Sequence, residues 1–337
     1  MIVKEGTDKF TVDTAIGTGP FKLKSWQAAT SWEVERNPNY WETDLPYLDG
    51  VREVVNTESA ARVQGVLSGD FGLAEEIDYS SAKSLMSDPQ AQVLAFEKGV
   101  VRILVTDCSV KPWTDERVRM AFKLAMNRDI AVQSVYQGLA TATSDINLLP
   151  SDPYYPPDLG VRAYDPEKAR SLLAEAGYPD GMDVELMTSN VYGGMPDLAV
   201  TYAQTAQQAG IRATIKQAAA ATYWDKIWMV RPFYTTYWQP NYPPDDLWYM
   251  YGPKSVYNEA KLDMPVFAQL FDQVLRTGDT QKQIELTQQG HLIAADKWAH
   301  IIPAVCKSPW LASPKLKGVQ GDPSMFRVRL KRAYFEQ

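Results

Sequence analysis

Hydrophobic and polar residues near the start of the chain alternate with the two-residue period of strands. Residues 21–25 alternate Phe, Leu and Ser with lysines, and residues 32–36 alternate Trp, Val and Arg with glutamates. A glycine-proline turn precedes the first run, and an Asn-Pro-Asn turn at residues 37–39 closes the second. Alternation bounded by turn residues is typical of strands, so we predict a pair of β-hairpin type here.

Further along, segments with helical periodicity alternate with strand-like runs. Asp165 and Pro166 form a helix start, apolar residues recur on one face, and Gly177 forms a stop. The predicted helices are residues 59–67, one capped by Asp115 with a continuation ending at Gly138, 166–176, 197–208, one from 265 onward, and 280–297. The predicted strands are residues 51–55, 100–106, 182–188, 211–215, 233–238, 301–305 and 326–330. This interleaving predicts an α/β fold with much parallel pairing.

Residues 223–251 are the part of this pattern that most suggests a binding site. Eleven of these 29 residues are aromatic, against 11% of the whole chain. A short helical piece and the strand at 233–238 lead into a proline-rich loop with Asn241, Asp245 and Asp246. Aromatic faces with a few convergent polar groups at a strand end are typical of small-molecule sites. The alternative is an aromatic core with a polar turn, in which the two aspartates cap the turn or begin a helix.

Composition narrows the class of protein. The 337 residues suggest about two domains, and 45% hydrophobic and 22% charged residues with a mean hydropathy of -0.31 are typical of a soluble globular protein. A net charge of -7 argues against a nucleic-acid or anionic-membrane surface. No apolar run reaches the roughly 18 residues of a spanning helix, and the first ten residues lack the pattern of a secretion signal.

Catalytic and metal chemistry have little support in the sequence. Cys108 and Cys306 form no metal motif, and they are either one disulfide bridge or two free thiols. The chain has two histidines, His291 and His300, which we expect at the surface. A Ser-His-Asp or zinc site is therefore poorly supported, and neither a GxGxxG motif nor a P-loop is present. We predict a protein that is not an enzyme and that carries no cofactor and no metal.

Several motifs together resemble a known family. The sequence GTGPFKL at residues 17–23 is followed about a dozen residues later by ERNPNYW at residues 35–41. A helix ending in Ser-Gly-Asp at residues 68–70 and the segment KPWTDERVR at residues 111–119 continue the match in order. These motifs resemble the family 5 extracellular solute-binding proteins, which are the peptide, nickel and opine receptors of ABC importers. The resemblance covers nearly the whole chain.

The resemblance implies an α/β fold like that of type II periplasmic binding proteins, whose ligand lies between two lobes that close about a hinge. Members of the family usually carry a long segment before the GTGPF motif, so the chain resembles their C-terminal two-thirds. The implied organisation is a partial first lobe at residues 1–108, a complete ligand-binding lobe at 109–310, and a return segment to the first lobe at 311–337. A partial lobe would leave open sheet edges that must be covered or associate.

The resemblance also implies which residues bind the ligand. Trp238 matches a tryptophan that lines the family's pocket, and Trp224 falls near a second one. Asn241 departs from the family, because peptide-binding members tend to have an acid there that holds the amino group of the peptide. An amide forms no ion pair with an ammonium, so Asp245 or Asp246 would take over that role. The implied ligand-binding residues are Trp224, Trp238, Asn241, Tyr242, Asp245, Asp246, Glu75 and Glu76.

The implied function is that of the solute-binding component of an ABC importer, which captures a peptide or another amine-bearing compound and then docks on a membrane permease. The resemblance places it in the periplasm or outside the cell, with no nucleic-acid partner. Two alternatives remain open at this stage. One is a glycosidase-like enzyme that uses Asp245 with Glu259 as its two carboxylates. The other is a protein-interaction domain whose exposed aromatic patch meets a partner.

Overall fold

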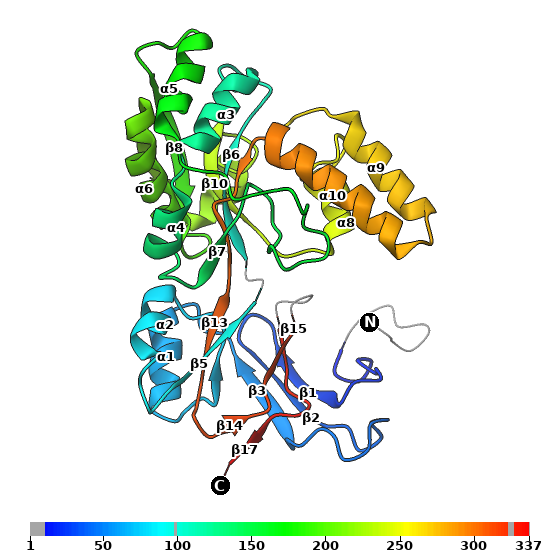
Figure 1. Cartoon of the computed structure of the whole chain (residues 1–337). Coiled ribbons are helices and arrows are strands. Elements are labelled where there is room, and N and C mark those ends of the chain that lie inside the picture. Colours follow the sequence, from blue (N-terminus) through cyan, green and yellow to red (C-terminus); the bar gives the residue numbers. More distant parts are fainter. Residues whose placement is uncertain (1–10, 98–99, 323–326, 337) are drawn as a thin grey trace. The chain divides into compact units, whose positions relative to one another are not determined.

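A computed structural model describes residues 11–97, 100–322 and 327–336 of the chain. The chain divides into two compact units (Figure 1). The first unit runs up to Phe96 and resumes at Pro309, and the second unit is Glu97–Ser308. The lobe boundaries at residues 108 and 310 stay predictions. No helix in the described ranges is both long enough and apolar enough to cross a membrane.

The first unit contains two three-stranded sheets, and one of them begins with the predicted hairpin. Its strands are β1 (Phe21–Gln27), β2 (Ser31–Arg36) and β3 (Gly50–Val54), paired antiparallel in that order. The hairpin prediction is confirmed, with Phe21 opposite Arg36. The second sheet has the order β4 (Leu73–Ala74), β13 (Ser308–Ala312) and β5 (Gln92–Phe96).

Among the described residues, the first unit also contains two helices and two two-stranded sheets. They are α1 (Ser59–Leu67), α2 (Tyr79–Leu85), β14 (Leu316–Lys317) with β17 (Tyr334–Phe335), and β15 (Gln320–Asp322) with β16 (Arg327–Arg329). The ring of Phe71 packs on Gly65 of α1, where an added Cβ would lie 2.2 Å from the ring, so only glycine fits there. The predicted last strand began at Phe326, which lies outside the described residues, and the described strand begins at Arg327.

The second unit is built on a five-stranded mixed sheet. Its order is β11 (His300–Ile301), β6 (Val101–Thr106), β10 (Phe233–Trp238), β8 (Met182–Ser189) and β9 (Ile211–Ala218). The pairs β10–β8 and β8–β9 are parallel, as the α/β pattern predicts, whereas β6 runs antiparallel to both of its neighbours. A small sheet pairs β7 (Ala140–Ala142) with β12 (Ala304–Cys306).

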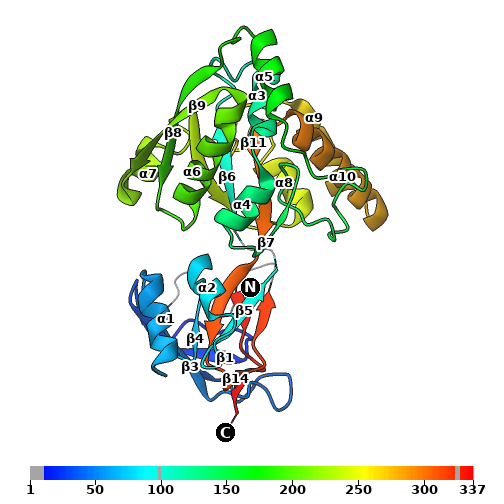
Figure 2. The same cartoon turned by 60° about the vertical axis from the view of Figure 1, so that its left-hand side comes forward.

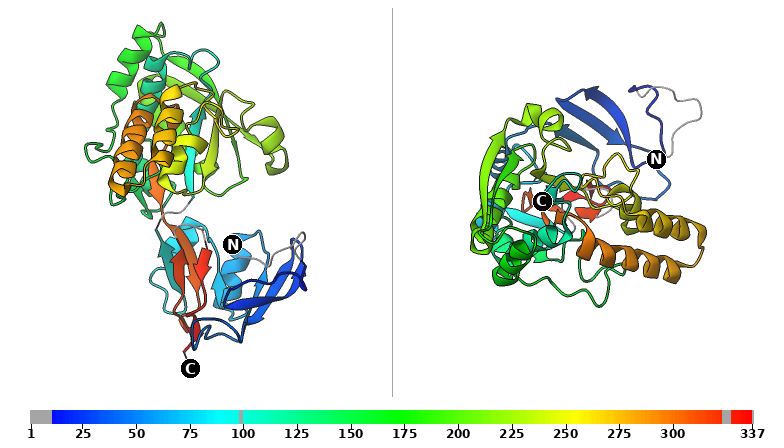
Figure 3. Two further views of the ribbon diagram at one scale, coloured as in Figure 1. Left: turned by 90° about the vertical axis from the view of Figure 1, so that its right-hand side faces the viewer. Right: turned by 90° about the horizontal axis from the view of Figure 1, so that it is seen from above.

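Helices pack against this sheet and against one another. They are α3 (Glu116–Leu124), α4 (Arg128–Ser134), α5 (Pro166–Glu175), α6 (Met195–Ala206), α7 (Tyr223–Lys226), α8 (Pro243–Tyr249), α9 (Pro265–Arg276) and α10 (Thr280–Lys297), with 3₁₀ turns at Gln207–Ala209 and Ala220–Thr222. Figure 2 shows α6 beside the sheet strands that it contacts. In Figure 3, α9 and α10 run side by side, and both contact α8.

Two predicted elements are each divided in the structure. The helix that Asp115 caps ends at Leu124, because the side chain of Asn127 accepts a hydrogen bond from the Ile130 N–H at 3.0 Å and begins a second helix. The predicted strand 301–305 is also interrupted. Its ends pair in different sheets, while the carbonyl of Pro303 accepts from the Thr143 N–H.

Strand β10 carries the core of the second unit on both of its faces. Phe233 lies 5.5 Å from the Phe122 ring and 5.6 Å from the Tyr202 ring, measured between centroids. Tyr234 points to the opposite side and joins the buried cluster with Phe267 and residues of α8 and α10. Burial on both faces makes β10 a rigid central strand, and its last residues carry the predicted site.

Candidate functional site

An aromatic wall lies where β10 ends and where α7 begins. We define it as Trp224, Trp228, Tyr237, Trp238 and Tyr257. Ring centroids are 5.6 Å apart for Trp224 and Trp228, 6.1 Å for Trp224 and Tyr237, and 5.9 Å for Trp238 and Tyr257, in edge-to-face contacts. Trp224 is 46% exposed, so its indole is a surface group rather than part of the core. These contacts bring the two predicted tryptophans into one cluster with three further rings.

A single buried carboxylate holds two indoles of the aromatic wall in place. Trp228 Nε1 donates to Glu259 Oε1 at 2.5 Å, and Trp238 Nε1 donates to Glu259 Oε2 at 2.6 Å. Burial raises the pKa of Glu259 to about 7, while these two hydrogen bonds act in the opposite direction. The His300 Nε2 atom lies 3.6 Å from Glu259 Oε2, and burial lowers the pKa of that imidazole to about 3, so it is neutral.

Glu259 is fixed by the loop that carries it. The Ala260 carbonyl accepts a hydrogen bond from the Cys108 N–H at 2.8 Å, and Lys261 Nζ pairs with Asp107 at 2.7 Å. Both partners directly follow strand β6, so the loop is attached to the central sheet. The role of Glu259 was missed from the sequence, where it was considered only as one carboxylate of a glycosidase pair. In the structure both of its oxygens accept hydrogen bonds from indoles.

The aromatic wall continues through a stacked tyrosine pair. Tyr192 and Tyr237 stack with their centroids 4.6 Å apart, and the guanidinium of Arg102 lies 4.8 Å from the Tyr192 centroid. Arg102 is buried and donates through Nε to the Gly193 carbonyl at 2.8 Å. Such cation–π contacts orient aromatic rings. No sequence motif pointed to Arg102 or Tyr192, because they meet only through the fold.

The polar side chains of the proline-rich loop differ in whether they already have hydrogen-bond partners within the protein. Asn241 Nδ2 donates to Asp246 Oδ1 at 3.0 Å, and Asp246 is buried in the first turn of α8. Asp245 is partly buried, and its carboxylate has no hydrogen-bond or ion-pair partner within the described ranges. Burial raises its pKa. Tyr242 is 53% exposed, and its hydroxyl lies 2.8 Å from the hydroxyl of Tyr154.

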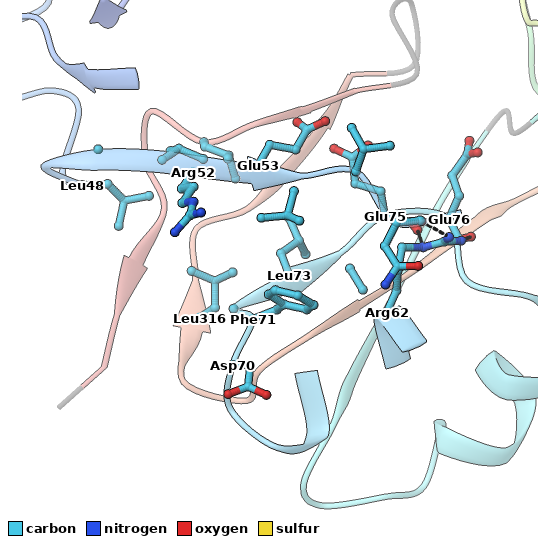
Figure 4. Close-up of a pocket in the computed structure, with 18 of the residues that line it drawn as sticks. Leu48, Arg52, Glu53, Arg62, Asp70, Phe71, Leu73, Glu75, Glu76 and Leu316 are labelled. Atoms are coloured by element: carbon cyan, nitrogen blue, oxygen red, sulfur yellow. Dashed lines mark hydrogen bonds between the residues drawn. The ribbon is translucent and has the colours of Figure 1, made fainter. Parts of the chain in front are cut away.

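Glu75 and Glu76 belong to the first unit, whereas the aromatic wall belongs to the second. Both line a cavity of about 530 Å³ beside β4 (Figure 4). The Arg62 guanidinium donates to their backbone carbonyls, at 3.1 Å to Glu75 and 2.9 Å to Glu76. Glu75 is exposed and Glu76 partly buried. Their role as ligand contacts stays a prediction.

The expectation of surface histidines is wrong. His291 is 0% and His300 is 1% exposed. His291 lies on the face of α10 that packs on Tyr251, with the ring centroids 5.9 Å apart, and burial lowers the pKa of this histidine to about 4. Side-chain burial here depends on packing between distant segments, which the local sequence does not reveal.

The cysteine alternatives are resolved in favour of free thiols. Cys108 and Cys306 are both buried and unbridged. The Cys306 thiol donates to the Val100 carbonyl at 2.8 Å, and burial raises the pKa of Cys108 to about 11. Both thiols are shielded by burial, and Arg102 Nη1 also donates to the Cys306 sulfur at 3.2 Å. Within the described ranges, no cluster of three or more His, Cys, Asp or Glu side chains could hold a metal ion.

The motifs that suggested a family are matched by a family model. The family described as bacterial extracellular solute-binding proteins, family 5 Middle, matches residues 1–259. The chain belongs to this family. The glutathione-binding protein GsiB of Salmonella paratyphi A is 26% identical over 336 residues, which cover 92% of this chain and 61% of GsiB. The chain therefore spans less than two thirds of the length of this family 5 relative.

Solved structures confirm the predicted fold type. DppA, an ABC transporter-associated periplasmic binding protein from Helicobacter pylori in complex with the peptide STSA, matches with a TM-score of 0.77 at 22% identity over 94% of this chain and 63% of DppA. NikA from Brucella suis in complex with Fe(III)-EDTA matches with a TM-score of 0.83 at 18% identity, over 99% and 71% of the two chains. The fold is the α/β architecture of type II periplasmic binding proteins of family 5, and no comparison supports the glycosidase or interaction-domain alternatives.

Proposed function

We propose that this family 5 chain is the solute-binding component of an ABC importer and captures a peptide or another small amine-bearing compound. The named relatives support this class of ligand, since one is a glutathione-binding protein and another is in complex with a peptide. The component acts in the periplasm or outside the cell, holds the solute between two lobes, and delivers it to a membrane permease. It performs no chemistry on the solute.

The observation that carries the proposal is the aromatic wall, which Glu259 holds in place. Asp245 follows seven residues after Trp238, and its carboxylate has no partner among the residues that the structure describes. Rings that are already oriented lose little entropy on binding, so they stack on a solute efficiently. A partly buried carboxylate without a partner is stabilised by an ammonium group. Because Asp246 is bound to Asn241, we assign the ammonium contact to Asp245.

The test is calorimetric titration of the protein with glutathione, the dipeptide Met-Leu and the tetrapeptide STSA, together with thermal unfolding. A ligand at 100 times its dissociation constant stabilises the folded protein by about 2.7 kcal/mol. We expect at least one of these amine-bearing compounds to bind, and its N-acetylated form to bind at least tenfold more weakly.

Two variants distinguish an ammonium contact at Asp245 from a general effect of removing one negative charge. Asp245→Asn should weaken binding of the free amine but not of the N-acetylated compound, whereas the exposed acid Glu167→Gln should change neither. Equal affinity for free and acetylated compounds would remove Asp245 from the site. Failure of all three compounds and their derivatives to bind would overturn the peptide proposal.

A further inference from the structure

Arg102 connects distant segments of the second unit through one buried side chain. Its Nε donates to the Gly193 carbonyl at 2.8 Å, and its Nη1 donates to the Val100 carbonyl at 2.5 Å and to the Cys306 sulfur at 3.2 Å. The side chain is buried, because Arg102 is only 6% exposed. A guanidinium is planar and donates in fixed directions, so these contacts hold it in one orientation.

The turn that receives Arg102 contains two consecutive glycines. Gly194 has a φ of +84°, a conformation that favours glycine, and it directly precedes α6. A Cβ added at Gly194 would lie 3.3 Å from Arg102 Nε, so a side chain there would press on the guanidinium. The same turn carries Tyr192, whose ring centroid lies 4.8 Å from the guanidinium. The sequence Tyr-Gly-Gly at residues 192–194 therefore fits Arg102 closely.

Tyr192 joins Arg102 to the aromatic wall. Tyr237 lies opposite Arg102 in the antiparallel pair of β6 and β10, and such partners carry their side chains on the same face of a sheet. Tyr192 stacks on Tyr237 with 25° between the ring planes, and Tyr237 in turn contacts Trp224. Glu259 fixes the two indoles that donate to it, whereas Arg102 acts on the tyrosine side of the wall.

Two of the acceptors of Arg102 lie near the points where the chain passes between the units. The second unit begins at Glu97 and ends at Ser308, so Val100 lies three residues after its start and Cys306 two residues before its end. The Cys306 thiol also donates to the Val100 carbonyl at 2.8 Å. Arg102 therefore bonds to the entering and leaving segments of the chain as well as to the turn beside the aromatic wall.

We propose that Arg102 is a positioning residue for solute binding, which holds the Tyr192–Tyr237 stack in its binding geometry and ties it to the segments that enter and leave the second unit. The proposal rests on the proposed function, because the aromatic wall is the surface assigned to the solute. Thermodynamic linkage is reciprocal, so a solute that binds better to the ordered rings also stabilises the Arg102 contacts that order them. The Cys306 thiol, which accepts from Arg102, should therefore react more slowly when solute is bound.

The first part of the test needs no solute. Arg102→Met removes the hydrogen bonds of the guanidinium but keeps an unbranched side chain, and Arg276→Met, at an exposed arginine that pairs with Asp272, is the matched control. We expect Arg102→Met to reduce the near-ultraviolet circular dichroism of the aromatic rings. We also expect it to speed the reaction of Cys306 with a thiol reagent about tenfold, because the segment opens more easily. Mass spectrometry distinguishes labelled Cys306 from labelled Cys108.

A second variant keeps the charge. Arg102→Lys retains a buried cation but cannot reproduce the planar arrangement of donors, so it should change both signals in the same direction and by a smaller amount. It carries the test if Arg102→Met does not fold. Far-ultraviolet circular dichroism shows whether each variant is folded.

The second part measures binding of glutathione, Met-Leu and STSA by calorimetry. We expect Arg102→Met to weaken binding about tenfold, and adding Tyr192→Leu to it should cause little further loss, because both changes disturb one stack. The preference for the free amine over the N-acetylated form should stay unchanged, since it is assigned to Asp245. Bound Met-Leu or STSA should slow labelling of Cys306 about fivefold in the native protein but not in Arg102→Met.

The outcomes separate this proposal from the proposed function. If none of the three compounds binds the native protein, the proposed function fails, and the measurements without solute still decide whether Arg102 orders the rings. The positioning role is overturned if Arg102→Met matches Arg276→Met in circular dichroism and in Cys306 labelling. It is also overturned if the losses from Arg102→Met and Tyr192→Leu multiply. Lower thermal stability with unchanged affinity would show that Arg102 serves folding alone, which overturns it as well.

Discussion

Burial distinguishes strands β6 and β10 of the second unit, which we call the closed unit, from strand β3 of the first, which we call the open unit. In the second unit, β6 and β10 are central strands buried on both faces, and both histidines lie in the core. In the first unit, β3 ends its sheet with Val54 exposed. The oriented rings of the aromatic wall belong to the closed unit, and the exposed edge strand β3 belongs to the open unit.

The largest effect should come from removing a core ring of the closed unit. Phe233→Ala deletes a fully buried side chain that contacts two aromatic rings, and it should lower the free energy of unfolding by about 3–5 kcal/mol. A smaller truncation in the open unit, Val54→Ala, should stay within about 0.5 kcal/mol, because Val54 is 43% exposed. Urea unfolding measures both. Similar losses for the two variants would show that the units do not differ in packing.

Acidification should lower the stability of the closed unit more than that of the open unit, because both histidines lie in the closed unit. Burial lowers the folded-state pKa of His291 to about 4 and of His300 to about 3, so stability falls as the pH drops from about 6.5 through these values. The raised pKa of Glu259 acts oppositely, since it costs stability as the pH rises from 4.5 to about 7. Two histidines outweigh one carboxyl, so the net loss on acidification should be on the order of a few kcal/mol.

Hydrogen exchange at pH 7 and pH 5 measures this difference unit by unit. The core amides of β6 and β10 should exchange faster at pH 5 after correction for the intrinsic rate, while those of β1 and β2 should change little. His300→Asn should make the exchange rates of the β6 and β10 amides depend less on pH. An equal acid response in both units would mean that the buried histidines do not control it.

A smaller effect should follow from changing the carboxylate that holds the aromatic wall. Glu259→Gln places an amide NH₂ against one of two indole N–H donors, so one hydrogen bond is lost and a buried donor stays unsatisfied. We expect a loss of about 1–3 kcal/mol in unfolding free energy and a red shift in tryptophan fluorescence. Glu285→Gln on the exposed surface is the control. An unchanged emission spectrum would contradict the orienting role of Glu259.

Local signals explain why much of the fold could be predicted from the sequence. The Asp165 cap and Gly177 stop of α5 and the β1–β2 hairpin are encoded within a few residues, and the structure contains them. Asn127 carries an equally local cap signal, which the expected continuous helix overlooked. The orienting role of Glu259 depends on Asp107 and Cys108, about 150 residues away in sequence, so no local pattern could reveal it.

The smallest effect on stability should come from protecting the open edge. Val55→Lys places a charge on a residue that is 50% exposed at the end of β3, where natural edges carry lysine. The backbone hydrogen bond from the Val55 N–H to Thr30 is kept, so the free energy of unfolding should change by less than about 0.5 kcal/mol. Association of the chain at high concentration, followed by light scattering, should nevertheless fall. Val256→Lys, at a valine that is 74% exposed in the closed unit, provides the matched charge change and should leave association unaltered. If both lysine variants reduce association equally, net charge rather than the open edge governs association. The contrast between the two units would then not extend to association with other chains.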